Sequence, residues 1–176
     1  MEDSILAESL KLITNDIIAY HFDSMGKEER TIEGIRKFAK EEGHINVENR
    51  DGIISHFTPI TKMDGKLYES FALKVIKLWK PEFKHNLTVS KSVPILYQRS
   101  LQQYYYFVTE DLLNKDVCEL LKDKIVLVGF LGPGDEDKHF TPMRNNEKNI
   151  EGKPDTYGLV IQANAIRTIL EYEKRD

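Results

Sequence analysis

The feature that most constrains this chain is a short apolar run that leads directly into an acidic, glycine-rich loop. Residues 125–128 are all aliphatic, and the loop that follows carries three glycines and the acidic triplet 135–137. A continuous apolar run of this length, ended by glycines, is typical of a strand that is covered on both faces in a parallel sheet. We therefore expect residues 125–128 to form a central strand. The loop then lies at the edge of the sheet where α/β folds usually bind their ligands.

The loop provides the first candidate ligand-binding side chains. They are Asp135, Asp137, His139 and Thr141. Carboxylates and a histidine at the end of a strand could bind a ligand or act as acid, base or cation ligand. Asp and Thr side chains also bind the backbone of their own loops, so a purely structural loop, with Phe140 and Pro142 closing the end of the sheet, is the alternative.

An aromatic run, residues 104–107, adds a further candidate. If this run is a strand, its side chains alternate between the two faces, and one pair belongs to the core. The other pair contains Tyr105, which could line a pocket because tyrosine combines apolar area with a polar tip. A half-buried strand without a ligand is the competing interpretation.

No complete catalytic set is visible in the sequence. The five histidines are scattered, and the glycines of the loop match neither a P-loop nor a dinucleotide fingerprint. The single cysteine, Cys118, lies in a segment that we expect to be a buried helix, and no serine has the flanks of a nucleophile elbow. We therefore predict no catalytic residue, no metal and no cofactor in this chain.

Elsewhere the hydrophobic spacing alternates between helical and strand patterns. Helices are predicted at residues 5–13, 31–39, 67–79, 111–122 and 158–172, and strands at residues 17–22, 44–47, 53–60, 94–97, 104–108 and 125–128. Asp51 and Gly52 between two of these strands are a strong signal for a β-hairpin. In the last helix one apolar face is expected to pack on the sheet; it consists of Leu159, Ala163, Ile166 and Leu170. The prediction is an α/β fold over residues 1–176: a single domain with a mainly parallel sheet flanked by helices and an inserted β-hairpin.

Composition limits the partners. At 40% hydrophobic and 31% charged residues, the 176-residue chain can bury a genuine core. The net charge of −4 and the scattered basic residues argue against nucleic acid. No apolar run reaches the length of a membrane span, so we expect membrane contact only through segments outside this chain.

Several segments together resemble a known family, the second class of CHASE domains. The resemblance rests on five segments in order: Gly43 to Val47, Asp51-Gly52, Phe71 to Leu73, the strand KIVLVG with the loop Asp137 to Pro142, and Gly158 to Ile166. These domains are extracellular sensors associated with cyclases and histidine kinases. The resemblance implies an extracytoplasmic (periplasmic) part of a bacterial inner-membrane protein.

The chain departs from the family pattern at two positions. Ile54-Ser55-His56 stands where an arginine commonly follows the hairpin turn, and Gln162 replaces a frequent histidine. Gln162 therefore joins the candidate ligand-binding residues, and a ligand that touches either position would differ from the usual one. The resemblance also implies that the chain, from Met1, follows an earlier strand unit and a membrane segment.

We interpret the chain as a sensory domain that binds an unknown small molecule or transmits a conformational state, and that has no enzymatic activity of its own. Two alternatives stay open. One is a soluble α/β hydrolase or transferase that uses Asp135, Asp137 and His139. The other is a dimerisation or scaffold module, and a homodimer is also compatible with the sensor.

Overall fold

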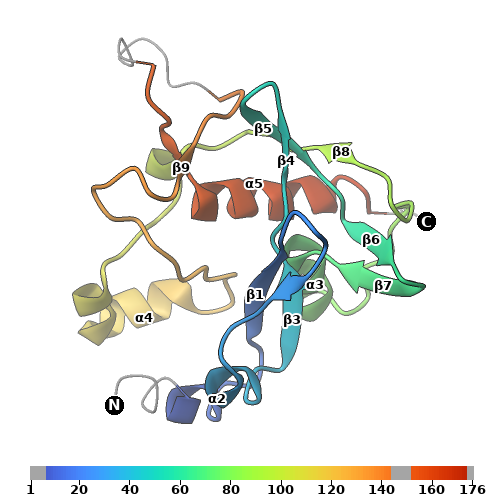
Figure 1. Ribbon diagram of the computed structural model, residues 1–176. Helices are drawn as coiled ribbons and strands as arrows, with labels where there is room; N and C mark the ends of the chain where they lie inside the picture. The colour runs from blue at the N-terminus through green and yellow to red at the C-terminus, as the bar shows by residue number, and fades with distance from the viewer. Residues whose placement is uncertain (1–6, 144–151, 174–176) are drawn as a thin grey trace.

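The computed structural model describes residues 7–143 and 152–173, and it forms an α/β domain centred on two packed helices (Figure 1). Helix α3 (Phe71–Trp79) packs against helix α5 (Gly158–Leu170). Their contact contains the most deeply buried aliphatic side chains, which are Leu73, Ile76, Ile161 and Ile169. Each such side chain stabilises the fold by roughly 1.5–3 kcal/mol. The helix pair is therefore the centre of the core.

Helix α3 begins at Phe71, later than the predicted start at residue 67. The Ser70 side chain accepts a hydrogen bond from the Leu73 main-chain N at 3.3 Å, which caps the first turn. The buried stripe of α3 recurs at helical spacing, and it comprises Ala72, Leu73, Val75 and Ile76. Pro81 follows the last turn and cannot continue a helix.

One small sheet is partly parallel. Strand β1 (Ile17–Phe22) pairs in parallel with β3 (Glu41–His44), and short helix α2 (Glu33–Arg36) precedes β3. Strand β2 (Glu28–Glu29) pairs with the opposite edge of β1, but only with His21 and Phe22. Within the described part of the chain, that edge of β1 therefore has no strand partner along residues 17–20.

Two hairpins follow, and the first confirms the predicted insertion. Strands β4 (Glu48–Arg50) and β5 (Ile53–Phe57) pair antiparallel, and β8 (Val93–Pro94) adds to the other edge of β5. The turn residues Asp51 and Gly52 have φ of 53° and 82°, as a tight hairpin turn requires. Strands β6 (Ile60–Met63) and β7 (Lys66–Glu69) form the second hairpin, and β7 overlaps the start of the helix that we predicted at residues 67–79.

The remaining elements are short. The 3₁₀ turns η1 (Leu101–Gln103) and η2 (Thr109–Leu113) lead to α4 (Lys115–Leu121), and β9 (Lys138–His139) pairs antiparallel with β10 (Thr156–Tyr157). The predicted strand at residues 104–108 is irregular. The predicted helix at 111–122 is present as η2 and α4, but α4 carries no buried residue and Cys118 is exposed, so this helix is not the buried crossover we expected.

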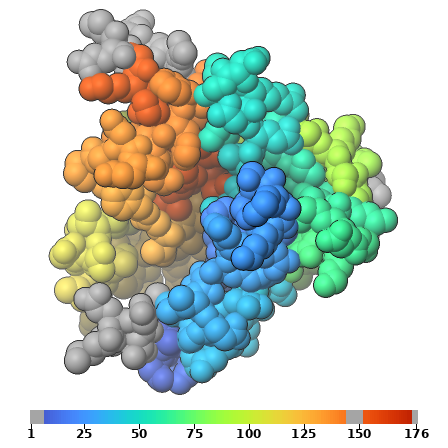
Figure 2. Space-filling model, viewed as in Figure 1, coloured from blue at the N-terminus to red at the C-terminus, as the bar shows by residue number. Residues whose placement is uncertain are grey.

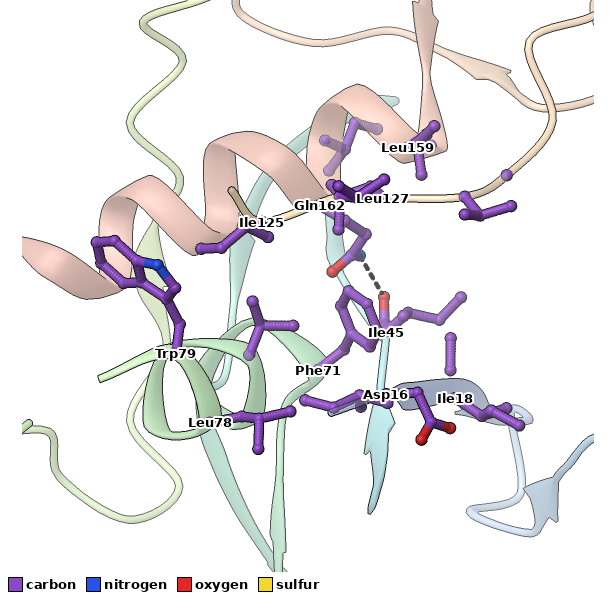
Figure 3. Close-up of a pocket in the computed structure, with 18 of the residues that line it drawn as sticks. Asp16, Ile18, Ile45, Phe71, Leu78, Trp79, Ile125, Leu127, Leu159 and Gln162 are labelled. Atoms are coloured by element: carbon purple, nitrogen blue, oxygen red, sulfur yellow. Dashed lines mark hydrogen bonds between the residues drawn. The ribbon is translucent and has the colours of Figure 1, made fainter. Parts of the chain in front are cut away.

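The mainly parallel sheet is the part of the predicted fold that is wrong. Among the described strands only β1 and β3 are parallel neighbours, and residues 125–128 are not a strand. Ile125 and Leu127 pack against the core, whereas Val126 is 50% and Val128 93% exposed. The side chains of this run are therefore apolar on both sides, but only the side with Ile125 and Leu127 is partly buried. The two helices and the hairpins already enclose the core, and the run lies along α5 instead of between strands (Figure 3).

Candidate functional site

A cleft of about 1300 Å³ lies between the open edge of β1, helices α3 and α5, and residues 123–130. We call it the central cleft. In Figure 2, part of α5 (red) is visible between the blue N-terminal surface and the orange surface of the residues around 125–143. The apolar walls include Ile17, Ile18, Val47, Phe71, Val75, Leu78, Trp79, Ile125, Leu127, Leu159 and Ile161. An apolar cleft with few polar groups is the usual form of a small-molecule site.

The labelled side chains show how the cleft is built (Figure 3). Trp79 and Ile125 lie at one end, and Ile18 and Asp16 lie at the other. Trp79 is 52% exposed although it ends the buried stripe of α3. Its ring lines the cleft, although its helical spacing is that of a core position.

Gln162 connects two walls of the central cleft. Its Nε2 donates to the Ile45 carbonyl oxygen at 3.1 Å, and the Ile45 main-chain N donates to the Tyr20 carbonyl oxygen at 2.8 Å. The side chain of a helix residue thus ends a hydrogen-bonded chain that starts in β1. Two hydrogen bonds therefore connect β1 with α5 through the main chain of Ile45.

Asp137 and His139 lie at the wall of the cleft next to the first turn of α5. The Asp137 Oδ1 is 3.6 Å from the His139 Nε2, and the Asp137 carbonyl oxygen accepts from the Gly158 main-chain N at 2.9 Å. A Cβ on Gly158 would lie 2.7 Å from Asp137 Oδ1, so any other residue at this position would force the Asp137 carboxylate to move. The structure therefore brings three of the predicted candidates, Asp137, His139 and Gln162, to one cleft.

The other three candidates lie elsewhere. Asp135 forms an ion pair with Lys138 at 2.9 Å, and this carboxylate raises the pKa of the Lys138 ammonium. Thr141 is 1% exposed, and its Oγ1 lies 2.9 Å from the Oγ1 of Thr156. Tyr105 is 91% exposed and lies outside the lining of the cleft. Asp135 and Thr141 thus have side-chain partners, Lys138 and Thr156, and neither of the two candidates lines the cleft.

Asp16 is the polar residue of the cleft that the sequence pattern did not reveal. Both of its carboxylate oxygens are buried, and neither has a hydrogen-bond partner in the part of the chain that the structure describes. It stands just before β1, where a single Asp between a helix and a strand is an ordinary loop residue. Nothing in the spacing distinguishes it, so only the three-dimensional arrangement identifies it.

Within residues 7–143 and 152–173, no three His, Cys, Asp or Glu side chains are grouped closely enough to hold a metal ion. Over the same residues, no helix is both long and apolar enough to cross a bilayer.

Comparison with known proteins gives one positive result. The family model described as the CHASE2 domain matches residues 2–176, which is essentially the whole chain. The match confirms the resemblance noted in the sequence. No curated protein and no solved structure is significantly similar to the chain.

Proposed function

Because this chain belongs to the CHASE2 domain family, we propose that it is the ligand-binding sensory part of a bacterial membrane signalling protein and that the central cleft is its ligand site. CHASE2 domains are extracellular sensory domains of signalling proteins, and they are not catalytic. The proposal extends this to a small molecule in the cleft, a periplasmic location, and membrane attachment through segments outside this chain.

The observation that carries the proposal is that one cleft is shared by the sheet and by α5. The hydrogen bond from Gln162 to the Ile45 carbonyl crosses from helix to sheet beside the apolar walls. A ligand in the cleft contacts both sides of this bond, so its binding energy can depend on their relative position. That dependence is the requirement for a ligand to shift a conformational equilibrium.

The helix α5 is the proposed output element. It lines the cleft through Leu159, Ile161 and Gln162, and it is the last helix of the described chain. A ligand that binds one position of α5 tenfold tighter than another shifts the equilibrium by about 1.4 kcal/mol. Such a bias is enough for a graded response, whereas a nearly complete switch from 1:99 to 99:1 needs about 5.5 kcal/mol.

Hydrogen exchange with a library of cell-envelope metabolites tests this function. A ligand is expected to slow exchange at the open edge of β1, residues 17–20, and to change exchange in α5. The variant Gln162→Leu is expected to bind the same ligand but to lose the change in α5, whereas the control Gln102→Leu, at an exposed position, keeps it. A ligand that protects β1 and leaves α5 of the wild-type protein unchanged refutes the output role of α5.

The hydrolase alternative has its own test. Its strongest support is the proximity of Asp137 and His139 at the cleft wall. The sensory proposal predicts no turnover of generic ester, phosphate and nucleotide substrates. Turnover that survives purification and disappears in Asp137→Ala would favour the hydrolase over the sensor.

A further inference from the structure

Asp16 lines the central cleft with a buried carboxylate that lacks a hydrogen-bond partner among the described residues. Its two oxygens are shielded from solvent, and no donor among residues 7–143 and 152–173 reaches either of them. An ionised carboxylate in such a place loses its hydration without compensation, so charged groups in protein interiors are normally paired. The missing partner of Asp16 has to be a hydrogen-bond donor, and a cation is the strongest one.

The charges of the cleft wall favour the same kind of partner. Its lining contains three carboxylates, Asp16, Asp123 and Asp137, and one lysine, Lys124. Asp137 already has His139 beside it at 3.6 Å. The remaining balance is negative, and a low-dielectric cleft strengthens the attraction of a cation to such a site.

The rest of the lining is apolar and aromatic. Ile18 lies next to Asp16 at one end of the cleft, and the apolar wall continues to Trp79 at the other end (Figure 3). A small inorganic cation would leave this wall exposed to water. A ligand that fits the whole cleft carries its charge at one end and an apolar body along the wall.

We propose that the central cleft binds an amphipathic organic cation, with a protonated amine at Asp16 and an apolar chain or ring along the wall toward Trp79. This inference rests on the proposed ligand site and specifies its chemistry. Asp16 acts as a specificity-determining residue, because it distinguishes an ammonium from a neutral or anionic group on the same apolar body.

Three probes of equal chain length separate charge from apolar contact. They are hexylammonium, 1-hexanol and hexanoate. Trp79 is the single tryptophan of the chain, so its fluorescence reports directly on the cleft. A charge-assisted hydrogen bond that replaces an unpaired buried charge is expected to make hexylammonium bind roughly tenfold or more tightly than 1-hexanol, and hexanoate weakest.

The matched variants are Asp16→Asn and Asp51→Asn. Both remove one negative charge, but Asp51 lies in an exposed hairpin turn whose positive φ suits asparagine. Asp16→Asn is expected to abolish the preference for hexylammonium while 1-hexanol still binds, and Asp51→Asn is expected to keep the preference. Thermal melting of both variants shows whether each is folded.

The outcomes test separately whether the cleft is a ligand site and whether Asp16 makes it prefer a cation. Equal binding of the three probes to the wild-type protein overturns the cationic ligand but leaves the cleft as a site. A preference for hexylammonium that persists in folded Asp16→Asn overturns the role of Asp16. If none of the probes changes the Trp79 fluorescence or the melting temperature, both the ligand class and the proposed site in this cleft are wrong.

Discussion

The side-chain amide of Asn164 accepts a hydrogen bond from the main chain of Arg99 and donates another to it. Asn164 Oδ1 accepts from the Arg99 N at 3.2 Å, and Asn164 Nδ2 donates to the Arg99 carbonyl oxygen at 2.9 Å. The same Oδ1 accepts from the Gln98 N at 3.0 Å. One turn further along α5, Thr168 Oγ1 accepts from the Leu96 N at 2.9 Å. Two side chains of α5 thus provide the hydrogen bonds that a neighbouring strand would give to residues 96–99.

Replacing Asn164 by alanine is expected to lower the free energy of unfolding by about 1–3 kcal/mol, because the variant leaves the polar groups of residues 98 and 99 without their partner. Asn164 is 0% exposed, so water does not replace the amide without rearrangement. Urea unfolding measures the change, and the exposed Asn49→Ala is the control, expected to stay within about 0.5 kcal/mol of the wild-type protein. Equal stabilities of the two variants would show that the amide does not hold this segment.

Gly43 is expected to be intolerant of a methyl group. A Cβ at this position of β3 would lie 2.5 Å from the Phe71 Cα and 2.7 Å from its N, and the backbone of α3 cannot move aside as a flexible side chain can. Gly43→Ala is therefore expected to destabilise the fold by roughly 1–3 kcal/mol or more.

Gly34 supplies the matched control for this comparison. It lies in α2, and no atom lies within 4 Å of its added Cβ. Gly34→Ala is expected to be neutral or to stabilise by up to about 1 kcal/mol, since alanine favours the helix. Melting temperatures that fall equally in both variants would contradict the close contact between β3 and α3.

A carboxylate is expected to destabilise the fold much more at residue 127 than at residue 126. Leu127→Asp puts a carboxylate against the core and is expected to destabilise by several kcal/mol, whereas Val126→Asp, at a side chain that is 50% exposed, is expected to change stability by about 0.5 kcal/mol or less. Cooperative melting of both purified variants makes the comparison. Loss of folding in Val126→Asp would indicate the interior strand that the sequence pattern predicted.

His44 is expected to make stability depend on pH. It is 2% exposed and lies against the rings of Tyr20 and Phe22, and this burial lowers its pKa from 6.5 to about 4. The unfolded chain takes up the proton first, so stability that is fully present above pH 6.5 is lost progressively as the pH falls toward 4. The loss attributable to this group is about 3 kcal/mol.

The measurement compares the wild-type protein with His44→Phe, which keeps a ring but does not titrate. Between pH 6.5 and pH 4, the unfolding free energy of the wild-type protein is expected to fall by about 3 kcal/mol more than that of His44→Phe. A difference between wild type and His44→Phe that does not vary with pH would contradict the buried neutral imidazole.

Local sequence signals were sufficient for part of the fold. Strand β1 matches its prediction, because aliphatic and aromatic residues in a short run favour a strand wherever one neighbour is available. The hairpin at Asp51-Gly52 was also predictable, since the positive φ of its turn depends on the residues themselves. Of the candidate site, the sequence pointed to Asp137, His139 and Gln162, which the structure places at one cleft.

Packing between distant segments accounts for what the sequence did not show. The face of α5 predicted from Leu159, Ala163, Ile166 and Leu170 is buried only at Ile166. The buried face instead includes Asn164 and Thr168, whose side chains accept hydrogen bonds from the main chain of residues 96–99. The run at 125–128 has the composition of a buried strand, but burial depends on which elements cover it, and here only one side is covered. Asp16 became a candidate only when β1, α3, α5 and residues 123–130 enclosed it, because the solvation of a carboxylate is a property of its surroundings and not of its neighbours in sequence.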